Sequence, residues 1–479
     1  MFLLGRGDLS GRLDPYFYQK KFLELAHFIE SSPLPFASLH TQARRIFSGI
    51  TPLSGGDAYT TAEAGVAFVR SGDFTEENTL DFTELNYIKP SIHQTLMKSS
   101  QLQRGDLLIA IVGATIGKVG LYLYDSPANI NQAICAVRFG GQLLPEYVQA
   151  YLAAPIGQAL LDRLKRPVAR ANINLEEIGS LQIPVLSIPK QQEVVSHLNH
   201  ALARKQEQEQ AAQALLAGLD GYLLGELGIE LPKSTSGKMI FYAQSDDVVG
   251  NRIDPKKYSA PVIALAAAVA ASPLPQKHLR DLITHLASGD WGGDEGDPKL
   301  GSAYRRCLVI RATEFDNLYN LRLTNGRVKY RMLDRFKLAR LDMQPYDLLL
   351  EKSGGSPDQP VGRIALLTPD LFGEELAYSN FIQKFRVDFA QVLPAYLFNF
   401  LKTMHNIKLT DAMQSQTNGI RNLISQEYFG QTIILPEPAK QKAIAEHMAA
   451  VRTKAKALAD QAQTDFAAAK AEIETLILA

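Results

Sequence analysis

Arginine and amide side chains gather at one place in each half of the chain. The segment RLKRPVARANIN supplies Arg166, Arg170 and Asn172, and QSQTNGIRN supplies Gln416, Asn418 and Arg421. Arg, Asn and Gln can form two parallel hydrogen bonds to one guanine or adenine edge, which is how proteins distinguish these bases. A solvated loop is the better explanation of a single copy, but the recurrence in both halves makes sequence-specific DNA binding about equally well supported.

The most basic stretch of the chain lies between residues 322 and 340. Its basic residues are Arg322, Arg327, Lys329, Arg331, Arg335, Lys337 and Arg340, and Asp334 is the acidic residue among them. Such a run can hold DNA phosphates or form a solvated surface. The sequence leaves both interpretations open.

Two motifs resemble parts of enzyme active sites but fit them poorly. GATIGK (113–118) has three residues between its glycines instead of the four of a phosphate-binding loop, and Val119 follows where Ser or Thr would bind a metal. We therefore predict a tight turn between two strands. DLLLEK clusters Asp347, Glu351 and Lys352, but the matching LLIAI in the first half lacks the charges of Glu351 and Lys352. We interpret it as a solvent-facing strand end.

No other signature of catalysis occurs in the sequence. His197 and His447 recur near the starts of two predicted helices, where packing or capping is the usual role of a lone histidine. Gly-x-Ser-x-Gly, His-Glu-x-x-His and clustered cysteines are all missing. We expect no catalytic residue and no metal site in this chain.

Length and composition narrow the class of protein. With 479 residues the chain holds about three domains, and 46% hydrophobic against 21% charged residues is typical of an ordered globular protein. Fifty Lys plus Arg balance fifty Asp plus Glu, so the net charge is zero. DNA binding must therefore use local basic patches.

Membrane insertion and disulfide bonding are not expected. The longest apolar run, Pro261–Ala271, is shorter than the ~20 residues of a membrane span, and residues 1–10 do not resemble a signal peptide. Cys135 and Cys307 both lie in apolar, strand-like runs, which excludes a disulfide framework and a thiolate metal site. A reducing cytoplasm is the expected location.

The chain repeats itself once. Five blocks recur in the same order: RLDPYFY as RIDPKKY, SSPLP as ASPLP, GDLLIAI as YDLLLEK, LLPEYVQAYL as VLPAYLFNFL, and KQQEVVSHL as KQKAIAEHM. The offset between copies grows from 240 to 250 residues along the chain, as small insertions would produce. The sequence therefore predicts two similar halves.

Each half begins with short apolar runs separated by Gly, Pro, Asn and Asp, which predicts a strand-rich domain. Helices are predicted at Gln19–Glu30, Pro145–Leu164, Pro261–Ala271 and Pro394–Thr403. Each half ends in a Pro-free segment, Lys190–Leu227 or Lys440–Ala479, rich in Ala, Gln, Glu, Lys and Leu. These segments predict helices on the order of 55 Å long.

The two long helices carry apolar seams at alternating steps of four and three residues, which is typical of a coiled coil. The predicted helix-pair packing residues are Val194, Leu198, Leu215, Leu219, Ile444, Met448, Val451, Leu458, Phe466 and Ile473. If the similar halves pack around a pseudo-twofold axis, the two helices run antiparallel and hold the globular domains apart.

The predicted fold is α+β, with two similar strand-rich domains separated by a long antiparallel two-helix coiled coil and a pseudo-twofold internal repeat. The predicted boundaries are domain 1 at 1–187, spacer helix 1 at 188–228, a linker at 229–245, domain 2 at 246–436 and spacer helix 2 at 437–479.

Several segments resemble the specificity subunits of type I restriction-modification systems. They are FSGITPLSGGDAY, VAFVRSGDF, GDLLIAIVGATIGKVGLY, NINQAICAVRF and, most specifically, NINLEEIGSLQIPVLSIPKQQEVVSHL. The second half departs from the family: GDWGGDEGDPK replaces the Gly-Thr-Pro segment and EKSGGSPDQPVGR replaces the GATIGK turn. The base-reading residues of that half are correspondingly harder to assign.

The resemblance implies two target recognition domains, each reading one half of a bipartite asymmetric target in double-stranded DNA, with the helices fixing the spacer. It implies no catalysis by this chain, two modification (methyltransferase) subunits as partners, and restriction/translocase subunits. S-adenosylmethionine, ATP and Mg are then expected on the partners and no cofactor on this chain. The expected DNA-binding residues are Arg44, Arg45, Arg70, Lys118, Arg166, Arg170, Asn172, Arg305, Arg306, Arg327, Lys329, Gln416, Asn418 and Arg421.

Two alternatives stay open. The chain could be the recognition subunit of a system whose methyltransferase and nuclease are fused in one partner. It could also be a two-headed scaffold that binds proteins, which would require large apolar patches on its domains.

Overall fold

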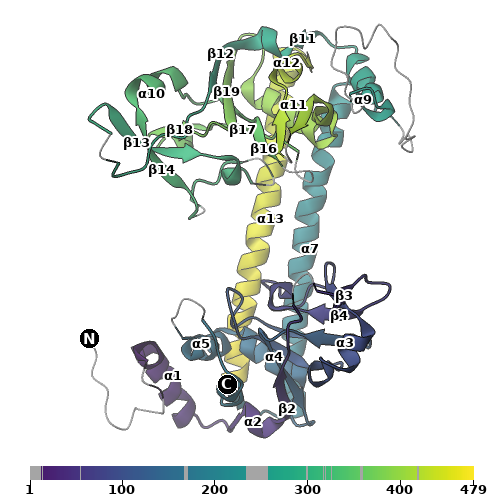
Figure 1. The fold of residues 1–479 in the computed structure, drawn as a ribbon, viewed down its shortest axis with the longest axis vertical. Coiled ribbons are helices and arrows are strands. Elements are labelled where there is room, and N and C mark those ends of the chain that lie inside the picture. Colours follow the sequence, from purple (N-terminus) through teal and green to yellow (C-terminus); the bar gives the residue numbers. More distant parts are fainter. Residues whose placement is uncertain are drawn as a thin grey trace. The chain divides into compact units, whose positions relative to one another are not determined.

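The computed structural model divides into two compact units (Figure 1). Unit 1 comprises Met1–Gln210 and Leu458–Ala479, and unit 2 comprises Ala211–Ala457. The structure describes residues 12, 14–53, 56–166, 171–232, 257–297, 300–316, 318, 320–324, 326–355, 360–417 and 420–479. Within these ranges, no helix is both long enough and apolar enough to cross a membrane.

Unit 1 combines short strands with helices. Its helices are α1 (Lys20–Ser31), α2 (Leu39–Gln42), α3 (Pro90–Gln94), α4 (Pro145–Ala153), α5 (Pro155–Leu164), α6 (Leu175–Gly179) and the first part of α7 (Ile188–Glu226), with 3-10 turns at Pro15–Tyr18, Ser71–Asp73 and Lys98–Ser100. Its strands are β1 (Phe36–Ser38), β2 (Ala43–Ser48), β3 (Tyr59–Thr60), β4 (Val66–Val69), β5 (Asn86–Ile88), β6 (Leu107–Ala110), β7 (Val119–Leu121), β8 (Ala128–Ile130), β9 (Ile134–Phe139) and β10 (Gln182–Pro184).

Unit 2 repeats this pattern. Its helices are α9 (Ala260–Ala270), α10 (Arg335–Leu341), α11 (Pro394–Asn406), α12 (Ser425–Phe429) and the first part of α13 (Pro438–Leu478), with 3-10 turns at Leu279–Leu282, Ala312–Glu314, Pro369–Leu371 and Leu409–Met413. Its strands are β11 (Gln276–His278), β12 (Ile283–Ser288), β13 (Tyr304–Ile310), β14 (Lys329–Asp334), β15 (Leu348–Glu351), β16 (Ser353–Gly355), β17 (Ile364–Leu366), β18 (Leu376–Tyr378), β19 (Ile382–Val387), β20 (Gln414–Thr417), β21 (Ile420–Leu423) and β22 (Thr432–Ile434).

The central four-stranded sheets of the two units have the same strand order. The order β2-β9-β6-β7 in unit 1 corresponds to β12-β19-β15-β17 in unit 2, and the parallel pair β4/β8 corresponds to β13/β18. Even an irregularity recurs, because the register shifts between Ala43 and Arg45 of β2 and between Ile283 and His285 of β12. The duplication predicted from the sequence is therefore present in the fold.

A buried glutamine near the start of each long helix repeats the same three hydrogen bonds. Gln191 accepts from the N–H of Leu144 at 2.8 Å and donates to the carbonyls of Gln142 and Leu186. Gln441 makes the corresponding bonds to the backbone of Leu393, Gln391 and Pro436. The backbone therefore follows the same course in both units at the point where the strand-rich part meets the long helix.

The helix predicted over Pro145–Leu164 is wrong in one respect, because the chain forms two helices there. Ala154, between α4 and α5, is extended (φ −71°, ψ 160°), since the residue before a proline avoids the helical region and Pro155 has no N–H to donate. A Cβ on Gly157 would lie 2.2 Å from the carbonyl oxygen of Tyr151, so the return of α5 onto α4 requires glycine.

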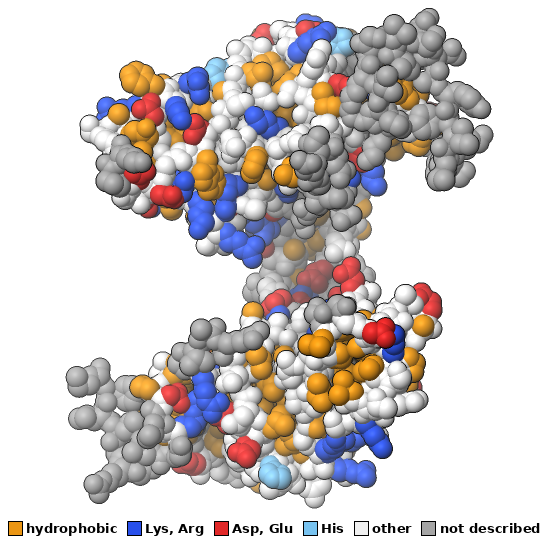
Figure 2. Space-filling model, viewed as in Figure 1, with side chains coloured by type: hydrophobic (Ala, Val, Ile, Leu, Met, Phe, Trp, Pro, Cys, Tyr) orange, Lys and Arg blue, Asp and Glu red, His pale blue; other side chains and the backbone are white. Residues whose placement is uncertain are grey.

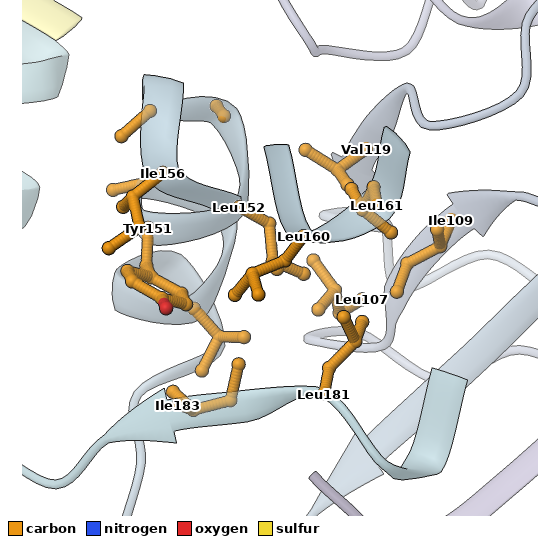
Figure 3. Packing of buried hydrophobic residues seen from close by; sticks show 14 of the residues in the cluster. Leu107, Ile109, Val119, Tyr151, Leu152, Ile156, Leu160, Leu161, Leu181 and Ile183 are labelled. Atoms are coloured by element: carbon orange, nitrogen blue, oxygen red, sulfur yellow. The ribbon is translucent and has the colours of Figure 1, made fainter. Parts of the chain in front are cut away.

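The core of unit 1 lies between the central sheet and these two helices. Figure 3 shows side chains of β6, β7 and β10 meeting those of α4 and α5. The residues labelled there are Leu107, Ile109, Val119, Tyr151, Leu152, Ile156, Leu160, Leu161, Leu181 and Ile183. Leu348, Leu350 and Ile364 occupy the corresponding strands of the unit 2 core.

Unit 1 also contains the last part of α13 and unit 2 the last part of α7, and the two long helices pair antiparallel within each unit. In unit 1, His197 contacts Glu472 at 2.9 Å, whereas Gln208 contacts Asp465 at 3.3 Å. The contacted residue of α13 thus has a lower number as the residue of α7 has a higher one, so the two helices run in opposite directions. In unit 2 the rings of Tyr222 and His447 lie 4.1 Å apart, and Glu226 pairs with Lys440 at 3.4 Å.

The predicted α+β fold, with two similar strand-rich domains and long antiparallel helices, is confirmed. Of the predicted helix-pair residues the structure buries Val194, Leu198, Leu219, Ile444, Met448, Phe466 and Ile473. Leu215, Val451 and Leu458 are half-buried. The predicted linker 229–245 lies mostly outside the described residues.

Candidate nucleic-acid interface

A turn at residues 131–133 joins the ends of three strands in unit 1. The N–H of Asn131 donates to the carbonyl of Val69 at 3.1 Å, and the N–H of Ile111 donates to Ala133 at 2.9 Å. Val69 ends β4, and Ile111 directly follows β6. Residues that follow β4 and β6, including Arg70, therefore meet at one edge of the unit.

Two more predicted residues reach this edge. Residues 113–118 form the tight turn between β6 and β7 that the sequence predicts, and Lys118 ends it. Asn172 pairs with Val112 in an isolated bridge and is exposed. We define edge 1 as Arg70, Lys118 and Asn172.

Unit 2 has the same edge, built by the same backbone contacts. The N–H of Ser379 donates to Ile310 at 2.9 Å, and the N–H of Lys352 donates to Phe381 at 2.9 Å. The residues at the positions equivalent to edge 1 are Arg311, Arg363 and Asn422, which we define as edge 2.

Most of the segment QSQTNGIRN is not the solvated loop that the sequence allowed as an alternative. It forms the antiparallel strands β20 and β21, and β16 extends them to a three-stranded sheet. The Asn-Gly pair between alternating side chains is a hairpin signal, which explains the difference. Among the described residues of unit 1, the equivalent contact is the bridge between Val112 and Asn172.

Each basic residue of the two edges has a carboxylate beside it. Arg70 lies 3.6 Å from Asp73, and Lys118 bonds Glu76 at 2.5 Å. On edge 2, Arg311 bonds Glu314 at 2.6 Å. The guanidinium of Arg363 donates to both oxygens of Glu351, at 2.8 and 2.9 Å. These carboxylates fix the orientation of the cations before any ligand arrives.

Further basic residues extend edge 2. Arg327 and Lys329 are exposed, and Lys329 lies opposite Val309 near the end of β13. The guanidinium of Arg311 donates to the carbonyl of Arg327 at 2.6 Å. Figure 2 shows Lys and Arg side chains gathered along one side of unit 2. An exposed basic group at a strand edge is suited to phosphate contact.

Four predicted residues lie away from the edges. Arg45 pairs with Arg138 on β9, three residues along β2 from Ser48 at the edge side, and Arg44 precedes it. Arg305 and Arg306 lie at the start of β13, whereas edge 2 follows its end. These residues lie three to six positions along a strand from the edges, which is about 10–20 Å, so a contact shared with the edges needs a broad DNA surface.

The remaining predicted residues fall into two groups. Arg166 donates two hydrogen bonds to Glu177, at 3.0 and 2.6 Å, and Arg421 is half-buried on β21. Arg170 and Asn418 lie outside the described residues, as does the side chain of Gln416.

The basic stretch 322–340 is partly neutralised. Arg322 pairs with Asp316, Arg331 with Asp294, and Lys337 with Asp290. Arg335 and Arg340 are exposed on α10. Phosphate contact and a solvated surface therefore remain alternatives for this stretch.

The interpretation of DLLLEK as a solvent-facing strand end is wrong. Asp347 is completely buried and accepts hydrogen bonds from Lys384 at 2.9 Å and Arg386 at 2.7 Å. Glu351 is buried against Arg363. The cations lie on β19 and before β17, far along the sequence, so the strand pattern alone did not reveal them. Within the described part of the chain, no group of three His, Cys, Asp or Glu side chains could hold a metal ion.

Sequence analysis missed Arg311 and Arg363. Both follow from the duplication, since the offset of 241 carries Arg70 to Arg311 and the β6/β7 register matches Lys118 to Arg363. Neither residue lies in a local cluster of basic residues, so the comparison of the two halves is the signal that identifies them.

Comparisons with known proteins support the family resemblance. No family model matches the sequence. The chain is 27% identical over 154 residues to the type I restriction enzyme EcoBI specificity subunit of Escherichia coli, a match that spans 32% of each protein. The matched segment is thus about a third of the relative's length. This match confirms the resemblance to type I specificity subunits.

Solved structures of the same description are similar at low identity. One, from work on assembly and conformational transition of the type I R-M system, gives a TM-score of 0.49 at 12% identity over 93% of this chain and 97% of that chain. A type I S subunit from M. genitalium gives 0.39 at 11% identity over 93% and 96%. The HsdS subunit of Thermoanaerobacter tengcongensis gives 0.37 at 12% identity over 93% and 96%.

Proposed function

We propose that this chain is the DNA-specificity subunit of a type I restriction-modification complex, with each unit reading one half of a bipartite asymmetric target. The observation that carries this proposal is the pair of edges, which present basic and amide side chains at equivalent positions of a duplicated frame. The sequence match to the EcoBI specificity subunit supports it independently.

The differences between the edges favour an asymmetric target. Lys118 presents a single ammonium, whereas Arg363 at the same position presents a planar fork that fits guanine. Edge 1 borders an irregular segment, and edge 2 borders the β20–β21 hairpin. Two surfaces with the same backbone arrangement but different side chains will prefer different base sequences.

We further propose that the chain is noncatalytic and acts in the cytoplasm. Two modification subunits would bring S-adenosylmethionine for methylation, and restriction/translocase subunits would bring ATP and Mg. The long helices α7 and α13 would set the number of unread base pairs between the half-sites. The zero net charge fits this arrangement, because partner subunits can supply many of the phosphate contacts.

The test is coexpression with the candidate modification subunit, followed by mapping of methylated adenines across the host DNA. One bipartite asymmetric motif, lost when this chain is omitted, is the expected result. A stable complex without any motif contradicts the proposal. Copurification with a single fused methyltransferase-nuclease favours the first alternative, and protein partners without DNA preference favour the scaffold.

A further inference from the structure

Residues 73–81 form a tight hairpin loop in unit 1, here called hairpin 73–81. The N–H of Asp81 donates to Asp73 at 2.8 Å, and the N–H of Thr75 donates to Thr79 at 3.0 Å. The hydroxyls of Thr75 and Thr79 also bond each other at 2.8 Å. The loop begins three residues after Arg70, so its base adjoins edge 1.

The tip of hairpin 73–81 holds the other end of edge 1. Glu76 bonds Lys118 at 2.5 Å, and the side-chain oxygen of Asn78 accepts from the N–H of Val119 at 3.1 Å. Asn78 is buried and has a positive φ of 61°, a conformation that asparagine tolerates better than most residues. The tip therefore fixes the residue that ends the β6–β7 turn.

The same tip contacts the long helix α7. Glu77, between the two residues that hold edge 1, accepts a hydrogen bond from Lys205 at 2.8 Å. Only 4% of Lys205 is exposed, and Glu209 is its other carboxylate partner. Burial opposes the charge on Lys205, but the two carboxylates outweigh it and raise the pKa of the ammonium.

Unit 2 contains an equivalent loop at residues 314–322. The N–H of Arg322 donates to Glu314 at 2.8 Å, and the N–H of Asp316 donates to Asn320 at 2.9 Å, as in hairpin 73–81. At the tip position the carbonyl of Leu318 accepts from Lys402 of α11 at 2.6 Å. A buried lysine thus reaches the loop tip in both units, although it comes from different elements.

We propose that Lys205 is a positioning residue for DNA recognition by unit 1. Through Glu77 and hairpin 73–81 it connects α7 to Lys118. Edge 1 is thereby held at a fixed position relative to α7. In unit 2, Lys402 of α11 holds the tip of the equivalent loop, and Glu314 at the base of that loop pairs with Arg311 of edge 2. This inference rests on the proposed function, because its consequence is a choice among DNA sequences.

The test compares methylation motifs in cells that coexpress the modification subunit with variants of the full chain. Lys205→Met and Glu77→Gln should each lower discrimination in one half-site by on the order of tenfold, about what one lost base contact produces. The other half-site should stay unchanged. Lys205→Arg, which preserves the charge, should retain the motif. Lys402→Met should relax the opposite half-site.

The matched control is Arg204→Met, which removes an exposed cation next to Lys205 on α7 and should leave the motif intact. Glu77→Gln preserves side-chain volume but removes the carboxylate charge that holds the Lys205 ammonium, so it keeps the test valid if Lys205→Met fails to fold. An unchanged motif in Glu77→Gln overturns the inference, as does equal weakening of both half-sites. Absence of any motif with the unaltered chain instead refutes the proposed function.

Discussion

The buried carboxylates of the two central sheets differ in how many cations they neutralise. Asp106 in unit 1 accepts two hydrogen bonds from Arg138, at 2.8 and 2.7 Å. Asp347, at the equivalent position, bonds Arg386 and also Lys384. Lys384 is completely buried, whereas Arg138 is 18% exposed. Removal of the carboxylate should therefore have unequal consequences in the two units.

Asp347→Asn should destabilise unit 2 by about 3–5 kcal/mol, since it leaves a buried ammonium without its counter-charge. Burial already lowers the pKa of Lys384, against the opposing influence of Asp347. Asp106→Asn should cost unit 1 only about 1.5–3 kcal/mol, because water partly reaches Arg138 and the amide still accepts a hydrogen bond. The two substitutions are chemically identical, so each serves as the control for the other.

Hydrogen exchange of the amides of Leu350 in β15 and Ile109 in β6 measures the two losses separately. The double variant Asp347→Asn with Lys384→Met should recover part of the stability, because the unpaired charge is gone and unit 1 has Ala136 at that place. The reasoning is refuted if Asp106→Asn costs as much as Asp347→Asn, or if the double variant is less stable than the single one.

Three further predictions concern the edges and the core. Arg363→Lys keeps the positive charge but loses the planar guanidinium. Motif mapping should show that discrimination in one half-site falls by about 1–3 kcal/mol, and an unchanged motif contradicts a base contact by Arg363. Burial lowers the pKa of His405 to about 4, below the ~6.5 of the unfolded chain, so stability is complete above pH 6.5 and falls as the pH drops towards 4. Urea unfolding at pH 7 and pH 5 should show this loss in the unaltered chain and less of it in His405→Gln; an equal loss in both excludes His405 as the cause. Gln441→Ala leaves three backbone groups unpaired and should destabilise unit 2 by about 2–4 kcal/mol in the same assay, and Gln191→Ala should do the same to unit 1.

The duplication and the long helices could be predicted because both depend on local pattern. The steps of four and three in α7 and α13 place Val194, Leu198, Ile444 and Met448 on buried faces whatever the rest of the fold does. The break at Pro155 also follows from a local rule, because the residue before a proline avoids the helical conformation. The sequence therefore contains this signal, but the apolar pattern on both sides of Pro155 predicts one continuous helix.

The pairing of charged side chains could not be predicted in the same way. Asp347 and Lys384 lie 37 residues apart and meet only because β15 and β19 are neighbours with a fixed register. Without that register, a carboxylate at the start of an apolar strand is most simply interpreted as solvent-facing. The same limit applies to Arg311 and Arg363, whose clustering depends on where the strands end.

The carboxylates beside the basic residues show how the zero net charge of the chain is expressed at the two edges. At both edges Arg or Lys is already held by Asp or Glu, as with Lys118 and Glu76 or Arg363 and Glu351. A DNA phosphate must then compete with a fixed carboxylate, which weakens binding to any sequence alike. A base edge that accepts hydrogen bonds from another side of the same guanidinium gains from its fixed orientation. If the edges read DNA as proposed, they contribute more to discrimination than to affinity, which suits a chain whose partners are proposed to hold the DNA backbone.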